Sequence, residues 1–343
     1  MKYLKFSLIL FVCTYLSANE THHLADSHAP ISVMGDHMHK KNEIMFSYRL
    51  GKMYMSDIFN GTKKVSENLV MSSPNGASDG TGTYMNSPIS MNMEMHMFGG
   101  MYAPNDNITL MIMGSYLNKE MISQRMPMAG GARWYANSSG FGDLRISGIF
   151  NILHSKKTKS HLGIGMSLPT GSINKRDTTP NSSNSRLGYA MQNGSGSYDP
   201  FIFFNNVNTF GKIKLGEQIF FKKPSSGKNS KGYNYGSSFE SRIWSSYRLI
   251  HNLSSSIQIN YKYQGNLKGE DDEMNPRMSP AMDSKNHGHQ KLNLSFGFNY
   301  VNHDNFLKNN RLGFEFIMPV FSRFSGLQMG EKYKIMIGWQ YGF

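Results

Sequence analysis

Residues 331–343, which read EKYKIMIGWQYGF, decide the fold because apolar and polar side chains alternate along them. One parity is apolar and mostly aromatic or β-branched: Tyr333, Ile335, Ile337, Trp339, Tyr341 and Phe343. A period of two predicts a β-strand with one apolar and one polar face. An apolar face this rich in aromatic residues is typical of a strand that contacts lipid, with a strand of a soluble sandwich as the alternative.

The first eighteen residues predict export. Lys2 and Lys5 precede a mostly apolar run that ends in small residues, so we expect a signal peptide with cleavage after Ala18. The run is too short for a comfortable membrane anchor. Cys13 is the sole cysteine and lacks the small residues before it that a lipoprotein site needs. The mature chain then has no cysteine, which excludes disulfides and thiolate chemistry.

Composition favours an all-β chain. The sequence is 39% hydrophobic and 13% aromatic, contains 34 glycines, and has no further apolar stretch of the ~18 residues that a transmembrane helix requires. The net charge is +13, or +11 without Lys2 and Lys5, and a basic exported barrel can bind phosphate-rich lipid headgroups. Export excludes nucleic acid as a partner.

Alternation recurs twelve times along the chain. We expect strands at 43–56, 89–102, 108–120, 142–152, 160–169, 197–210, 213–223, 236–250, 253–266, 290–302, 311–321 and 331–343. Short connections (103–107, 153–159, 211–212, 251–252 and 303–310) alternate with long ones (57–88, 121–141, 170–196, 224–235, 265–289 and 322–330). This alternation predicts an antiparallel up-and-down transmembrane β-barrel of about 12 strands in a bacterial outer membrane, with short periplasmic turns and long external loops.

The parity of each strand assigns its faces. The apolar parity, which begins with Ile44, Phe46 and Tyr48, is expected to face lipid. Charges near the middle of the lipid face cost about 2–4 kcal/mol for Arg or Lys. The charged parity is therefore expected to line the interior, either as ion pairs or as hydrated wall: Glu43, Arg49, Asp143, Arg145, Glu240, Arg242, Arg248, Lys262, Lys291, Arg311, Glu315 and Lys334.

Two regions depart from this pattern. Residues 201–204 are apolar on both faces and Glu217 shares the parity of Ile213, so we expect a bulge there. Residues 19–42 show no period of two and form an expected tail or plug ahead of the barrel at 43–343. This segment is rich in His and Met: His22, His23, His28, Met34, His37, Met38 and His39.

Several stretches resemble one known family. They are Met34-Gly35-Asp36-His37-Met38-His39-Lys40, Ser47-Tyr48-Arg49, Ser139-Gly140-Phe141-Gly142-Asp143-Leu144, Ser167-Leu168-Pro169-Thr170-Gly171, Gly194-Ser195-Gly196-Ser197-Tyr198-Asp199 and Trp339-Gln340-Tyr341-Gly342-Phe343. In these stretches the chain is similar to the outer-membrane family named for the MetA pathway of phenol degradation. The resemblance implies an exported barrel that transports small or apolar molecules, and it implies no functional residues.

The 26 methionines raise the question of copper, because thioethers suit Cu(I). Met91, Met93, Met95 and Met97 alternate with Glu94 and His96, and we expect the methionines to face lipid and the polar pair to face inward. The hypothesis is then a soft-ligand patch that holds or passes copper together with the tail: His37, Met38, His39, Met53, Met55, Glu94, His96, Met111 and Met113. The alternative is that methionine fills irregular space. The loop residues either extend such a path or pack the loops: Met121, Met126, Met128, Met274, Met278 and Met282.

The remaining residues do not indicate catalysis, because no spacing marks a nucleophile elbow or a zinc-binding helix. An outer-membrane enzyme is therefore the third hypothesis. A basic cluster in an external loop predicts contact with lipopolysaccharide: Lys222, Lys223, Lys228 and Lys231. Twelve strands are intermediate between a filled barrel and an aqueous pore. We therefore expect a narrow channel for a small solute without a cofactor, with a metal-handling barrel as the second hypothesis.

Overall fold

The structure is a computed structural model that describes residues 24–225, 227–302 and 309–343. The predicted signal peptide, His22, His23 and most of the predicted turn at 303–310 lie outside the described residues. Within the described part, the helices are α1 (Glu67–Ser72) and the short 3-10 helices η1 (Ala25–Ser27), η2 (Pro127–Ala129), η3 (Tyr189–Met191) and η4 (Pro280–Met282). None of these described helices is long and apolar enough to span a membrane.

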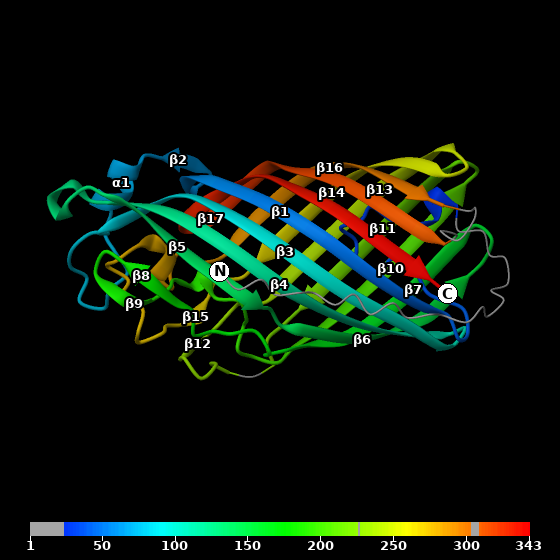
Figure 1. Cartoon of the computed structure of the whole chain (residues 1–343), viewed down its shortest axis with the longest axis horizontal. Coiled ribbons are helices and arrows are strands. Elements are labelled where there is room, and N and C mark those ends of the chain that lie inside the picture. Colours follow the sequence, from blue (N-terminus) through cyan, green and yellow to red (C-terminus); the bar gives the residue numbers. More distant parts are fainter. Residues whose placement is uncertain (1–23, 226, 303–308) are drawn as a thin grey trace, which may run out of the picture.

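Eleven strand elements form one closed antiparallel ring (Figure 1). In chain order they are β1 (Ile44–Gly61), β3 (Asn86–Asn105), β4 (Ile108–Arg125), β6 (Leu144–His154), β7 (Thr158–Leu168), β10 (Asp199–Phe210), β11 (Ile213–Lys222), β13 (Ser238–Ile250), β14 (Leu253–Gln264), β16 (His289–Val301) and β17 (Asn310–Gly342). Each pairs with the next along the chain, and β17 returns to pair with β1. The predicted all-β, up-and-down antiparallel barrel is confirmed.

The last element, β17, passes through the wall twice. Its first half pairs with β16 as far as Phe324, and its second half pairs with β1 from Phe324 to Gly342. The chain reverses beside Gly326, whose φ of 73° lies in the region that glycine favours. Ten elements that cross once and one that crosses twice give twelve passes. The predicted long loop at 322–330 is wrong, because both halves of the hairpin extend into it.

The longest connections gather at one end of the barrel, together with α1 and the short strands (Figure 1). These strands are β2 (Lys63–Val65), β8 (Arg176–Thr179), β9 (Ser182–Arg186), β12 (Tyr233–Asn234) and β15 (Lys268–Gly269). The connections at the opposite end are short turns, such as the two residues between β10 and β11. The predicted sorting of loops by length therefore holds, with the β17 turn as the exception.

The wall strand next to β4 is broken into two segments. The segment β5 (Arg133–Phe141) pairs with the outer half of β4, and β6 pairs with the inner half. At the break, the Asp143 carboxylate accepts hydrogen bonds from the backbone N–H groups of Gly171 (3.0 Å) and Ser195 (2.8 Å). A Cβ on Gly194 would lie 2.2 Å from the Gly171 carbonyl oxygen, so a larger residue does not fit there. Three of the stretches that carry the family resemblance therefore meet at one structural junction.

The facing of the strands follows the predicted parity in most places. Large apolar side chains cover the outer wall: Phe46, Ile146, Phe150, Ile243, Tyr247, Ile257, Ile259, Tyr263, Phe296, Phe298, Tyr300, Leu312 and Phe314 are all exposed. Buried charged side chains line the interior, among them Arg49, Lys291, Arg311 and Glu315. An apolar exterior around a charged interior is the arrangement of a transmembrane barrel.

The predicted bulge near residues 201–204 is wrong. The register between β10 and β11 runs without a shift from Phe201 opposite Lys222 to Phe210 opposite Ile213. Phe201 and Phe203 are buried inside the barrel, where they pack against residues of the N-terminal segment. Glu217 lies on the outer face, and its carboxylate accepts a hydrogen bond from Asn206 Nδ2 at 3.3 Å.

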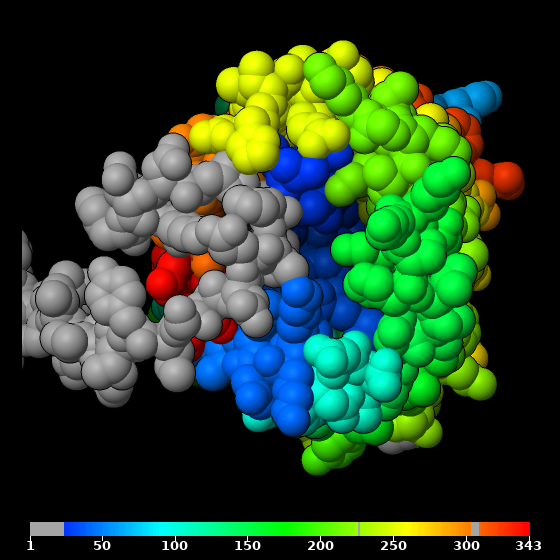
Figure 2. Space-filling view, turned by 90° about the vertical axis from the view of Figure 1, so that its right-hand side faces the viewer, coloured from blue at the N-terminus to red at the C-terminus, as the bar shows by residue number. Residues whose placement is uncertain are grey.

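Residues 24–42, here called the plug, lie inside the ring and are visible at its turn end (Figure 2). Side chains of seven wall strands hold the plug by hydrogen bonds to its backbone. The donors or acceptors are Thr109 of β4, His161 of β7, Asn205 of β10, Gln218 of β11, Ser254 of β14, Asn299 of β16, and Arg311 and Glu315 of β17. The apolar plug side chains Ile31 and Val33 are each only 1% exposed.

Deleting Phe343 should impair closure of the ring. Phe343 N donates to the Ile44 carbonyl and Ile44 N donates to the Phe343 carbonyl, each at 2.9 Å, and the Phe343 ring lies 5.8 Å from that of Phe46. The truncated chain leaves the β1 edge unpaired at this rim. We expect a smaller fraction of folded barrel, measured by heat-modifiable gel migration after refolding. Phe343→Leu keeps the backbone pair and should fold normally. Equal yields from the truncated and full chains would disprove a closing role for this pair.

Candidate functional site: an outer pocket above the plug

A pocket of about 320 Å³ opens among the loops at the outer end of the barrel. Its walls come from β3, β4, β5 and the two loops 169–198 and 265–288. The apolar side chains that line it are Met121, Trp134, Leu187, Met278 and Met282. Arg176 and Glu273, which form an ion pair, belong to a polar part of the lining that also includes Asn86, Ser123, Thr179, Asn181, Asn184, Ser185, Arg186, Asn275 and Ser279. This size and lining suit a small apolar or aromatic molecule.

Trp134 has a fixed orientation in this pocket. Its indole Nε1 donates to Asn86 Oδ1 at 3.1 Å, and Asn86 Nδ2 donates to the Met278 carbonyl at 2.7 Å. The Asn86 amide thus ties β5 to the loop 265–288 and satisfies the indole N–H, which leaves the ring available for apolar contact. The next residue, Tyr135, is 57% exposed.

A buried ion pair holds the two pocket loops together. Arg186 and Asp271 have side chains that are only 3% and 1% exposed, and Arg186 Nε lies 3.1 Å from Asp271 Oδ2. Arg186 Nη1 also donates to Asn174 Oδ1 at 2.8 Å. The backbone N–H of Asp271 donates to the Tyr189 hydroxyl at 3.0 Å, and burial raises the pKa of Tyr189 to about 12. The tyrosine therefore stays neutral at any physiological pH.

Further contacts close the loop end. The Tyr84 hydroxyl donates to Asp283 Oδ2 at 2.5 Å, and Asn286 Nδ2 donates to the same hydroxyl at 2.9 Å. Burial lowers the pKa of His287 to about 4, and its ring lies 5.0 Å from that of Tyr189 in an edge-on arrangement. His287 is thus a neutral packing residue, and these contacts fix the outer loops to one another.

Charged side chains line the lumen between the pocket and the plug. Lys291 Nζ lies 2.6 Å from Glu331 Oε1, and Lys262 Nζ lies 3.7 Å from Glu240 Oε1. The β1–β17 register places Glu331 nearer the outer turn than Gln340, which contacts the plug-bound Arg311. Glu331 therefore lies closer to the outer end of the barrel than the plug contact at Gln340 does.

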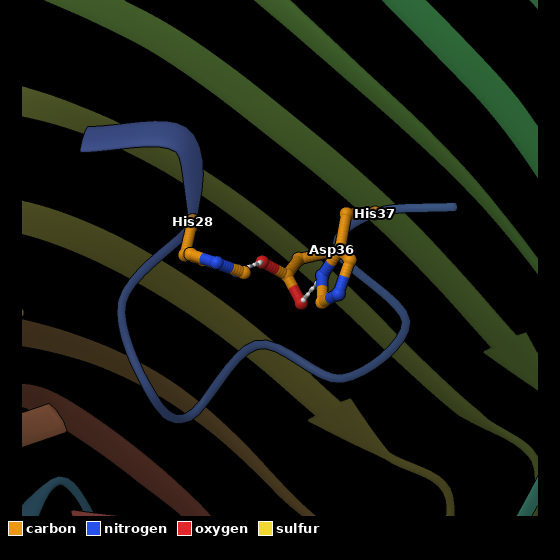
Figure 3. A group of neighbouring side chains, drawn as sticks. All are labelled: His28, Asp36 and His37. Carbon is orange, nitrogen blue, oxygen red and sulfur yellow. Dashed lines mark hydrogen bonds and ion pairs between the residues drawn. The ribbon is translucent and has the colours of Figure 1, made fainter. Parts of the chain in front are cut away.

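The plug carries a cluster of imidazoles around one carboxylate (Figure 3). His37 Nδ1 lies 2.9 Å from Asp36 Oδ1, and His28 Nδ1 lies 3.9 Å from Asp36 Oδ2. The His39 ring is 4.9 Å from that of His37. Burial raises the pKa of Asp36, but nearby His37, Arg311 and His28 outweigh it and hold the pKa well below the usual value. Burial lowers the pKa of His39.

The structure does not assemble the predicted soft-ligand patch, because Glu94 and His96 face outward. Lys52 Nζ pairs with Glu94 at 2.7 Å, and the Tyr48 hydroxyl hydrogen-bonds His96 Nδ1 at 2.8 Å. These cross-strand contacts satisfy both polar groups on the outer wall. The methionines of the same strand face the lumen instead: Met91 and Met97 are buried, and Met97 packs against Ile31 of the plug. The predicted facing of this strand was wrong.

The predicted inward methionines lie at two different levels. Met53, Met55, Met111 and Met113 share the inward parity, as expected. Met113 and Ser47 both lie opposite Gly99, which places Met113 six residues below Met53, or roughly 20 Å along the strands. Of the predicted ligands, the structure brings together His37 and His39, whereas Met38 packs with the apolar cluster around Phe203.

Several site residues had no distinguishing signal in the sequence. His28 and Asp36 lie in the same His-rich segment as His37, but the plug has no periodicity from which their proximity could be read. Met121, Met278 and Met282 were expected only as a path or as loop packing, and they line the pocket with Trp134. The separate loops that carry them are brought together by tertiary contacts alone.

Solved structures of outer-membrane barrels are similar to this chain. The COG4313 outer membrane channel from Pseudomonas putida F1 has 12% identity and a TM-score of 0.62, over 91% of this chain and 100% of that chain. The transport unit of the autotransporter AIDA-I from Escherichia coli has 10% identity and a TM-score of 0.49, over 93% and 96%. The toluene transporter TodX of P. putida has 9% identity and a TM-score of 0.42, over 89% and 91%. No protein-family profile and no curated protein matches the sequence. The likeness to the COG4313 channel shows that the chain has the fold of that outer-membrane barrel.

Proposed function

We propose that the protein is an outer-membrane channel that admits small apolar molecules through the loop pocket. The observation that carries this proposal is the pocket of about 320 Å³ lined by Trp134, Leu187 and three methionines at the outer end of the barrel. A pocket with these apolar side chains in its lining favours uncharged solutes over ions. No catalytic step is part of this function.

The exterior of the barrel supports the location. A wall of exposed Phe, Ile, Leu and Tyr side chains is stable against lipid, and a soluble protein rarely exposes so large an apolar surface. The COG4313 protein of P. putida, which has the same fold, is an outer-membrane channel, and this agrees with the assignment. Membership of the family named for the MetA pathway of phenol degradation forms part of the proposal, as does contact of the external lysines with lipopolysaccharide.

Passage requires three steps in this arrangement. An apolar solute first leaves water for the pocket, where burial of its surface stabilises it by about 25 cal/mol per Å². It then moves past the charged lumen wall, for which it has little affinity, so it does not remain trapped. The plug finally has to shift, because it occupies the turn end of the barrel (Figure 2). Transport is diffusion down a concentration gradient.

Replacing Trp134 by Ala should weaken capture of an aromatic solute. The change removes the largest apolar surface of the pocket, so we expect the concentration for half-maximal uptake to rise about tenfold, equivalent to about 1.4 kcal/mol. The measurement is the initial uptake of radiolabelled naphthalene by cells that produce the protein, compared with cells that lack it. Tyr135→Ala is the matched control, since it removes a neighbouring aromatic ring that is exposed. Unchanged uptake in the Trp134 variant, or an equal loss in both, would count against the pocket as the entrance.

A further inference from the structure

The plug histidines have the geometry of a metal site, although the pocket needs no metal. His28, Asp36 and His37 each offer one ligand atom, and these atoms lie within 4.8 Å of one another. Around a tetrahedral ion with bonds of about 2.0–2.2 Å, ligand atoms are about 3.3 Å apart. One carboxylate oxygen of Asp36 lies 2.9 Å from His37 Nδ1 and the other lies 3.9 Å from His28 Nδ1, and these separations bracket that value (Figure 3). Small side-chain rotations would therefore bring the three donors onto one ion.

His39 lies next to these three residues, with its ring centroid 4.9 Å from that of His37. Its Nδ1 lies 3.3 Å from Glu43 Oε2, and its Nε2 is buried without a hydrogen-bond partner among the described residues. A carboxylate on one ring nitrogen is the usual outer partner of a metal-binding histidine, because it fixes the tautomer and leaves the other nitrogen unprotonated. Burying such polar atoms is unfavourable unless something binds them.

The charges around the cluster do not exclude a cation. Arg49 and Arg311 lie nearby, and the carboxylates of Asp36 and Glu315 offset them. The remaining ligands are imidazoles. Imidazole with carboxylate suits Zn²⁺ and the other divalent ions of its class, whereas Cu(I) prefers thioethers and thiolates.

We propose that His28, Asp36, His37 and His39 bind one divalent transition-metal ion of the zinc class inside the barrel. The ion joins the two ends of the plug turn between His28 and Asp36 and thereby rigidifies the plug. This site shares His37 and His39 with the patch expected from the sequence, but it contains no thioether: its donors are nitrogen and oxygen, and all four residues belong to the plug. It is also independent of solute capture at the outer pocket.

The test is metal titration of the folded, detergent-solubilised full chain after removal of metal by a chelator. We expect one Zn²⁺ per chain in calorimetry, and a Co²⁺ complex with the visible absorption of a tetrahedral site. His28→Ala, His37→Ala and His39→Ala should each weaken Zn²⁺ binding more than about tenfold and abolish the Co²⁺ spectrum. Heat-modifiable gel migration verifies that each variant is folded.

Two controls separate this site from adventitious binding by histidine. His154→Ala removes an exposed histidine of β6, and a His22→Ala/His23→Ala variant removes the other histidines of the N-terminal segment. Both should bind Zn²⁺ like the unmodified chain. Absence of saturable binding overturns the proposal, as does loss of binding in a control variant. Retained tetrahedral Co²⁺ absorption in the folded His39 variant overturns the four-residue ligand set.

Discussion

Replacing residues 25–39 by a Gly/Ser segment of equal length should turn a narrow or silent barrel into an open channel. The plug owes its position to side chains such as Ile31 and Val33, each 1% exposed, and to Asp36, which is 6% exposed. Gly and Ser cannot bury comparable apolar surface, so the segment would remain a flexible chain. The lumen of a barrel with twelve wall passes is then obstructed only by wall side chains. We expect a several-fold rise in single-channel conductance in planar bilayers.

The control is an equal Gly/Ser replacement of residues 74–83, a loop segment with one isolated β-bridge between Pro74 and Thr83. This variant alters the outer loops and leaves the plug intact, so its conductance should stay near that of the unmodified chain. Equal conductance of the plug variant and the unmodified chain would place the constriction elsewhere, at the ion pairs around Lys291 and Glu331. Since the barrel wall is unchanged in both variants, folding can be verified by the same gel assay.

The second large effect is expected from Asp271→Asn. This change leaves the Arg186 guanidinium charged and buried without its carboxylate, and breaking a buried pair in this way typically costs about 3–5 kcal/mol. The change destabilises the loops and not the barrel wall, because both residues lie outside the wall strands. At 3 kcal/mol the population of opened loops rises roughly a hundredfold. We expect rapid proteolysis within 169–198 and 265–288, and loss of naphthalene capture, while the barrel stays folded.

Two further variants make this prediction specific. Arg186→Met with Asp271→Leu replaces the pair by apolar side chains of similar size, and such replacements are often neutral or stabilising. The double variant should therefore recover protease resistance. Asp79→Asn removes a carboxylate that pairs with Arg277 on the exposed surface and should have no measurable effect. Protease resistance in the Asp271 variant equal to that of the unmodified chain would refute the role of this pair in closing the loops.

The strands could be predicted because a half-buried strand repeats every two residues, and that pattern is local. The pattern gave the wrong prediction at 322–330. The chain reverses at Gly326 within so few residues that the sequence contains no run of loop-type residues there. The pattern also failed for Glu94 and His96. The sequence predicts that both side chains face inward, because exposing a polar group to lipid is unfavourable. On the outer wall, however, Lys52 pairs with Glu94 and Tyr48 hydrogen-bonds His96, and these contacts reduce the free-energy cost. Cross-strand partners are known only once the register is known.

The candidate site was harder to predict than the wall. Pocket residues such as Trp134 and Met278 come from loops whose positions depend on the Arg186–Asp271 pair and the Tyr84–Asp283 hydrogen bond, each between residues distant in sequence. In the plug, His37 and His39 were candidates by composition. Their association with His28 and Asp36 depends on a turn that wall side chains hold in place, and no periodic pattern encodes it.

The contacts of the plug also determine the order in which the molecule can fold. The Ala29 carbonyl binds Arg311, 282 residues away, and Ser32 binds Glu315, 283 residues away. Forming contacts this distant in sequence costs the loop-closure entropy of nearly the whole chain. Such contacts therefore form late. The plug precedes every wall strand in the chain, yet its partners exist only after the last hairpin is in place. Refolding should therefore show two phases, with formation of the wall first and docking of the plug second.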